Sequence, residues 1–82
     1  ALTVSFGSFG GLGGGKDHVE VLLHDISGRL VTTIAQGEFS AGFHQAAWNG
    51  LDHDGHRVAV GLYFLRVRTA GRTNNLKLVV LP

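Results

Sequence analysis

Residues 19–34, VEVLLHDISGRLVTTI, contain one apolar run before and one after a Ser-Gly pair. Alternate residues of the first run share one face of an extended strand, namely Val19, Val21 and Leu23. Gly28 tolerates the positive φ that a tight turn requires. The stretch therefore predicts a β-hairpin in which residues 19–25 pair with residues 29–36.

Short runs of similar character lie on both sides of this hairpin. They occupy residues 2–6, 43–49, 62–69 and 75–81. Most of the chain's thirteen glycines fall between the runs, and no segment shows the 3.6-residue period of a helix. Short strands separated by turns at this spacing predict an all-β sandwich of six to seven antiparallel strands.

The alternation within these runs also predicts the core and the turns. The side chains expected inside the sandwich are Val21, Leu23, Trp48, Tyr63, Leu65 and Val67. Trp48, the only tryptophan, is expected to pack centrally between the sheets. The glycines expected to form structural turns are Gly28, Gly42, Gly55 and Gly61.

Composition restricts the functions open to the chain. Its 82 residues suffice for one small core, so a single domain spanning residues 1–82 is expected. Charged residues make up 16% of the chain and the net charge is +1, which provides no strong field for nucleic acid. The apolar runs are too short to cross a bilayer, so membrane insertion is not expected. The chain has no cysteine and therefore no disulfide.

A glycine-rich stretch near the start divides the domain. We expect a first strand at residues 1–6, a flexible tether at residues 7–16 and a main body at residues 17–82. The tether is long enough for the first strand to pair within its own chain or with a second copy. Apolar residues before and within it form a candidate assembly segment, namely Leu2, Val4, Phe6, Phe9 and Leu12.

The segment LDHDGH, residues 51–56, has the residue types of a metal site and of a turn. The candidate metal ligands are Asp52, His53, Asp54 and His56. An EF-hand type of loop would require a carboxylate six residues after its glycine, and that position is Gly61. The alternative is a turn in which the aspartates accept backbone N–H groups beside Gly55. We favour the turn, and expect no metal and no cofactor.

Catalysis is not expected. None of the four serines has a nucleophile-elbow sequence, and so small a domain has little space for a closed pocket. His44 shares a strand face with Trp48 and is expected to be half-buried and hydrogen-bonded to the backbone. Trp48 could stack on a sugar only if it were exposed.

Two surface features leave their function open. Arg66, Arg68 and Lys77 are expected on one sheet face beside Phe64, as a solvated face or as a contact for an anion-rich partner. Phe39 and Phe43 are candidates for a second, apolar patch.

Several motifs resemble the FlgD-type immunoglobulin-like domain, over about residues 18–81, with residues 2–6 similar to the first strand of that family. The family's D-x-S-G-R-x-V and A-G-x-H motifs correspond to Asp25, Ser27, Gly28, Arg29 and Val31 and to Ala41, Gly42 and His44. Its W-D-G and D-x-x-G…V-x-x-G-x-Y motifs correspond to Trp48, Asn49 and Gly50 and to Asp52, Gly55, Val58, Gly61 and Tyr63. The glycine-rich tether and the ending VVLP depart from the family pattern.

The resemblance implies an immunoglobulin-like fold and a non-catalytic structural or docking module of a bacterial protein, outside the cell or on its surface. The implied partners are other protein chains, including copies of the same chain. Two alternatives stay open. One is a C-terminal export-sorting or surface-anchoring domain of a larger secreted protein, and the other is a glycan-binding module.

Overall fold

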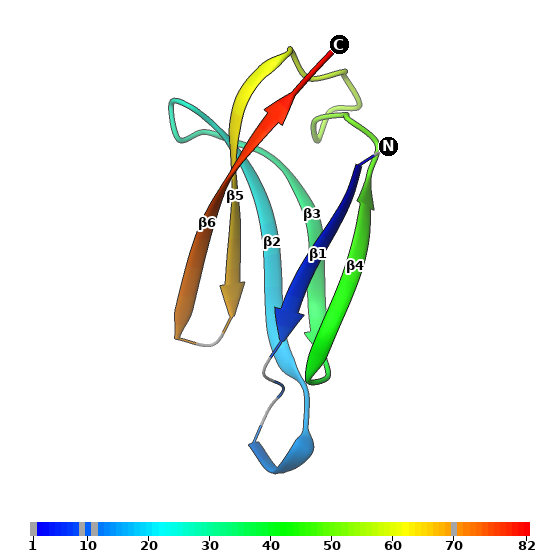
Figure 1. Cartoon of the computed structure of the whole chain (residues 1–82), viewed down its shortest axis with the longest axis vertical. Helices are drawn as coiled ribbons and strands as arrows, with labels where there is room; N and C mark the ends of the chain where they lie inside the picture. The colour runs from blue at the N-terminus through cyan, green and yellow to red at the C-terminus, as the bar shows by residue number, and fades with distance from the viewer. Residues whose placement is uncertain (1, 9, 11, 70) are drawn as a thin grey trace.

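The computed structural model describes residues 2–8, 10, 12–69 and 71–82, and Figure 1 shows the whole chain. The strands are β1 (Leu2–Ser8), β2 (Asp17–Asp25), β3 (Leu30–Phe39), β4 (Gly42–Trp48), β5 (Gly61–Thr69) and β6 (Arg72–Val80). A short 3₁₀ segment, η1 (Leu12–Gly14), precedes β2. Every strand pair is antiparallel. The prediction of an all-β, immunoglobulin-like sandwich is therefore confirmed, with six strands.

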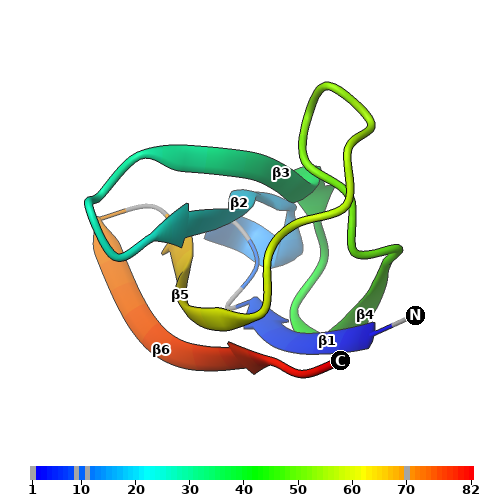
Figure 2. The ribbon, with the colours of Figure 1, turned by 90° about the horizontal axis from the view of Figure 1, so that it is seen from above.

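The strands form two sheets that face one another (Figure 2). One sheet contains β1 and β4, and the other has the strand order β3-β2-β5-β6. β2 is a central strand of the wider sheet, so its inward side chains are fully buried: Val19, Val21 and Leu23. Each predicted core residue lies in the buried cluster between the sheets: Val21, Leu23, Trp48, Tyr63, Leu65 and Val67.

The hairpin of residues 19–36 pairs with two interruptions. The register between β2 and β3 shifts between Val21 and Leu22 and again between Leu23 and His24. As a result Ile34 and Val31 have no partner residue on β2. Such β-bulges bend the strand and release backbone groups from the ladder. The carbonyl of Val31 is therefore free to accept hydrogen bonds from His53.

β1 and β6 both extend further than the sequence pattern predicted. β1 continues past Phe6 to Ser8, because Ser8 pairs with Gly42 and its hydroxyl donates a hydrogen bond to the Phe39 carbonyl over 3.2 Å. The tether between β1 and β2 is accordingly residues 9–16, two residues shorter than expected. β6 begins at Arg72, three residues before the predicted start, because its first residues continue the ladder with β5.

β3 also continues beyond its predicted end, to Phe39. Phe39 packs edge-on against Phe6, with ring centroids 5.1 Å apart, and lies against the core. The prediction of an exposed patch made of Phe39 and Phe43 is wrong for Phe39, because pairing with β2 turns that side chain inward. Phe43 is 90% exposed.

The four predicted turn glycines occupy two kinds of position. Gly28 and Gly55 lie in tight turns, with φ of +89° and +84°. Gly42 and Gly61 are instead the first residues of β4 and β5, with φ of +122° and +143°. At all four positions the backbone adopts a conformation that residues with a Cβ rarely tolerate.

Most of the candidate assembly segment can be located. Leu2, Val4 and Phe6 lie in β1, and the latter two are buried in the core. Phe9 lies outside the described residues, as does the side chain of Leu12, whose backbone belongs to η1. In the described part of the chain, no helix combines the length and apolar character required to cross a membrane.

Candidate functional site: two aspartate turns

The five residues Asp25–Arg29 and the five residues Asp52–His56 form the same turn. In each, Oδ1 of the aspartate accepts the backbone N–H groups of the residues two and four positions later, over 2.9–3.0 Å. The aspartate N–H donates to the carbonyl of the fifth residue, and the glycine N–H donates to the aspartate carbonyl. A short acceptor side chain and a glycine at positive φ thus close both loops.

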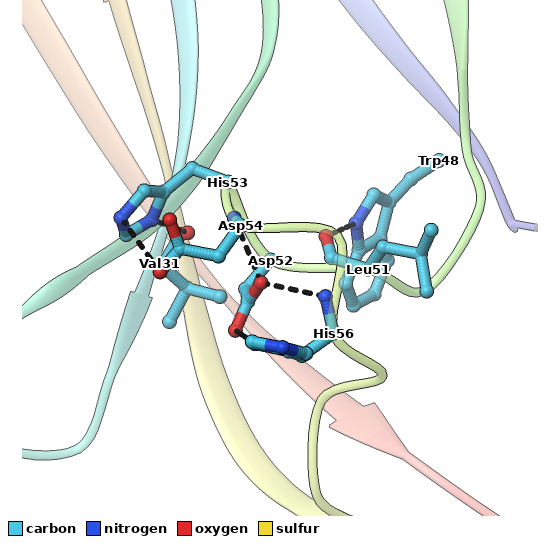
Figure 3. A network of polar contacts seen from close by, with 7 residues as sticks. All are labelled: Val31, Trp48, Leu51, Asp52, His53, Asp54 and His56. Atoms are coloured by element: carbon cyan, nitrogen blue, oxygen red, sulfur yellow. Dashed lines mark hydrogen bonds and ion pairs between the residues drawn. The ribbon is translucent and has the colours of Figure 1, made fainter.

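The second turn is fastened to the body of the sandwich (Figure 3). The backbone N–H of His53 donates to the Val31 carbonyl over 3.1 Å. Nδ1 of His53 lies 2.9 Å from the same oxygen; since a carbonyl only accepts, Nδ1 carries a proton. Trp48 Nε1 donates to the Leu51 carbonyl over 3.0 Å, and the Tyr63 hydroxyl donates to the Ala59 carbonyl over 2.6 Å. Two core aromatic residues therefore hold the loop at both ends.

Three of the four candidate metal ligands lie together. Ligand atoms of Asp52, Asp54 and His56 are within 4.8 Å of one another, whereas His53 turns toward β3. Oδ1 of Asp52 is already used by two backbone N–H groups, and its Oδ2 lies 4.0 Å from Nδ1 of His56. These hydrogen bonds show that Asp52 stabilises the turn. The expectation that folding needs no divalent metal stays a prediction.

The turns shift the acidity of three groups. The hydroxyl of Ser27 and the backbone N–H groups beside it hold the pKa of Asp25 below its ordinary value of 3.8. Backbone N–H donation, first from His56 and then from Asp54, lowers the pKa of Asp52 in the same way. The Val31 carbonyl, and after it the Asp54 carboxylate, raise the pKa of His53 above 6.5. All three shifts favour the charged form of the group concerned.

These shifts predict how stability depends on pH. A carboxyl group whose pKa is lowered by folding stabilises the native state above its ordinary pKa, and this contribution is lost as the pH falls through the folded value. We therefore expect the melting temperature to fall between about pH 5 and about pH 2. Asp25→Asn and Asp52→Asn keep an acceptor oxygen but remove the titration, so each should flatten this acid decline. Thermal melts followed by circular dichroism over that range test the prediction.

Asp17→Asn is the matched control, because Asp17 belongs to neither turn. An acid decline that is equally steep in the parent and in both turn variants would contradict the role assigned to the two aspartates. The raised pKa of His53 stabilises the native state at low pH, whereas the two aspartates stabilise it at higher pH. Its contribution is fully present below pH 6.5 and is lost as the pH rises through the folded value.

A shallow groove separates the two turns. It has a volume of about 310 Å³ and carries both signs of charge, because Asp25, Arg29, Asp52 and Arg57 line it together with Tyr63. Arg29 approaches Asp25 over 3.4 Å. The arrangement offers hydrogen bonds to a polar partner, but no serine hydroxyl in the described part of the chain is hydrogen-bonded to a histidine ring.

The structure also places His44 and Trp48, the two residues that the sequence predicted on one face of β4. His44 is half-buried, stacks on Phe6 and has Nε2 2.8 Å from the Ser40 carbonyl. Trp48 is 6% exposed, so it presents no face on which a sugar could stack.

The basic cluster lies on the outer face of the wide sheet. Arg66 and Arg68 alternate with inward residues of β5, and Lys77 pairs with Phe64 across the β5–β6 ladder. Arg66 Nε donates to Asn75 Oδ1 over 3.2 Å. The three cations are exposed, and no carboxylate forms an ion pair with them among the described residues.

The equivalence of the two turns is the feature that sequence reasoning missed. Both have the spacing D-x-x-G-x, in DISGR and DHDGH. The turn was already favoured for Asp52, and the shared spacing of the two pentapeptides supports one structure for both.

A six-stranded antiparallel sandwich with an apolar core defines an immunoglobulin-like domain. A family model, the FlgD Ig-like domain, matches residues 7–72 of the chain. The chain belongs to this family, which confirms the resemblance seen in its motifs and identifies it as a structural, protein-interaction type of domain. Searches of curated proteins and of solved structures found no significant match.

Proposed function

We propose that this domain joins protein chains outside the bacterial cytoplasm and assembles with copies of itself by exchanging β1. Family membership supports the general role in protein interaction. The observation that carries the more specific role is the position of β1. The strand supplies core side chains, yet a glycine-rich tether of residues 9–16 is its connection to β2.

The burial of its apolar side chains favours a β1 that is paired with β4, either of its own chain or of a second copy. Val4 and Phe6 are 6% and 5% exposed, and burial of each is worth about 1.5–3 kcal/mol. In the described residues β1 pairs with β4 alone, from Leu2 opposite Trp48 to Ser8 opposite Gly42. The same strand from a second copy offers identical donors, acceptors and side chains, so it can replace β1 in the same register.

The tether is long enough for this exchange. Eight residues span at most about 26–29 Å when extended, and the two shorter dimensions of the domain are 23 and 20 Å. The tether is therefore long enough for β1 to reach a second copy that lies next to the domain along one of these two shorter dimensions. Exchange from each copy to the next produces a filament when the repeated rotation between copies does not close into a ring.

The two alternative functions receive less support. Glycan binding by Trp48 is disfavoured by the burial of its indole ring, which leaves Phe43 as the exposed aromatic residue of β4. No contact in the described residues bears on export sorting or surface anchoring.

Size-exclusion chromatography with light scattering tests the proposed exchange. The mass of the parent chain should rise with concentration, and further after refolding at high concentration. The control is the double variant Thr3→Cys/Ala47→Cys, oxidised when dilute, because these partners on β1 and β4 lie at disulfide distance and the chain has no other cysteine. It should stay monomeric until reduced. A parent chain that is monomeric under every condition would overturn the exchange.

A further inference from the structure

The two sheets differ in width, and no strand among the described residues pairs with the edge of the narrow sheet that β1 forms. Two strands, β1 and β4, face four strands of the other sheet. All partners of β1 in the described residues are on β4. Alternate residues of an antiparallel strand direct their N–H and C=O groups to opposite sides, so about half of those groups on β1 point away from β4. Figure 2 places β6 on that open side.

The inner face of β6 lacks a cover in the same region. Leu76 pairs with Leu65 and Leu78 pairs with Tyr63, which places both leucines on the core-facing side of the sheet. Leu65 is 5% exposed, whereas Leu76 is 54% exposed. A leucine that faces the core side yet remains half exposed shows where the narrow sheet ends.

Two depressions follow this seam, which we call the β1–β6 groove. The larger, of about 480 Å³, is lined by uncharged residues that include Phe6, Phe43, Val67 and Leu76. The second, of about 320 Å³, lies between Leu2 and the last residues of β6 and has Arg57 as its charged residue. The groove thus combines an unpaired strand edge with an apolar floor.

Nothing in the sequence of β1 protects this edge. Natural sheet edges are commonly shielded by charged residues, proline or a bulge. β1, LTVSFGS, contains no charge and no proline, and its register with β4 is continuous. An edge with these properties is suited to accept another strand.

We propose that the β1–β6 groove binds a single extended segment of another protein chain, uncharged and with apolar side chains at alternate positions. The segment pairs with β1 as a third strand of the narrow sheet and lays its apolar side chains on Leu76 and Leu78. This inference rests on the protein-assembly function proposed above and specifies the partner. It is distinct from strand exchange, because β1 stays in place.

The chemistry of the groove selects this partner. A charged segment would lose its hydration against the uncharged lining without gaining an opposite charge. A second folded sandwich is less suited to the groove, because β6 already lies on the open side of β1 (Figure 2). One strand fills the space between β1 and β6 and satisfies the free backbone groups.

The probe is a capped seven-residue peptide with valine at its second, fourth and sixth positions and serine or threonine elsewhere. The control peptide has the same composition with its three valines adjacent, so the middle valine points to the opposite face of a strand from the other two. Each is titrated into the ¹⁵N-labelled full chain. We expect the alternating peptide to bind at least tenfold more tightly, and the β1 amides to exchange more slowly with solvent when it is bound.

Two variants localise the binding. Leu76→Asp places a charge in the groove and should weaken binding tenfold or more. Leu62→Asp makes the same change on the outer face of β5 and should bind like the parent, because Leu62 is also exposed but alternates with the inward Tyr63. Comparison of the two melting curves verifies that both variants are folded.

Three results would overturn the proposal: equal affinity for both peptides, an unchanged affinity in Leu76→Asp, or the absence of binding. Faster exchange of the β1 amides would also overturn it, because the peptide would then have displaced β1. Each of these results leaves the assembly function itself open to its separate test by light scattering, so the two can fail independently.

Discussion

Trp48→Ala is expected to lower the free energy of unfolding by about 4–6 kcal/mol. Removing a buried tryptophan costs about 3–5 kcal/mol through lost burial and the resulting cavity. The Leu51 carbonyl also loses the indole N–H, a bond worth about 1 kcal/mol. For a domain of this length the total stability is about 4–12 kcal/mol. Urea denaturation followed by far-ultraviolet circular dichroism measures the loss.

Two comparisons separate the contributions of Trp48. Trp48→Phe retains an aromatic side chain but not the hydrogen bond to Leu51, so it should lose less stability than the alanine variant. Phe43→Ala on the same strand should change stability by no more than about 0.5 kcal/mol, because Phe43 is 90% exposed. If Trp48→Ala lost no more stability than Phe43→Ala, the central position of Trp48 in the core would be wrong.

Deletion of residues 1–15 is the second change with a large expected effect. It removes β1, and with it Val4 and Phe6 from the core and every backbone partner of β4 in the narrow sheet. The lost burial alone is worth about 3–6 kcal/mol. We expect the truncated chain to lack a cooperative thermal transition and to aggregate.

A peptide with the sequence of residues 1–8, ALTVSFGS, should restore the transition when added to the truncated chain. The matched control is the same peptide with Val4→Ser and Phe6→Ser, which keeps the backbone but removes the two core side chains. Rescue by the first peptide alone would show that β1 binds without its covalent link, as exchange between copies requires. Failure of both peptides, or equal rescue by both, would contradict the assigned role of β1.

Local patterns were sufficient to predict the fold class and much of the core. Alternation with a period of two is imposed by the geometry of one strand, so it can be recognised without knowing which strand lies alongside. It correctly indicated the hairpin of β2 and β3 and the strand character of β5. The tight turn at Gly28 was also predictable, because positive φ restricts the choice of residue locally.

Long-range pairing determined the features that the pattern did not contain. Phe39 turns inward because β3 continues its ladder with β2, and Ser8 belongs to β1 because it meets Gly42. The carbonyl of Val31 is available to His53 because a β-bulge removes Val31 from the register. The pairing of Phe39 with β2, of Ser8 with Gly42 and of Val31 with His53 each joins residues more than twenty positions apart.

The candidate sites show the same division. The spacing D-x-x-G-x is sufficient to specify both aspartate turns, since their hydrogen bonds lie within five residues. The β1–β6 groove is different. Leu65 and Leu76 carry the same side chain and face the same side of one sheet, yet only the first is covered. The sequence determines which way each leucine points, whereas the width of the opposite sheet, which arises from tertiary pairing, decides whether that leucine meets another side chain or solvent.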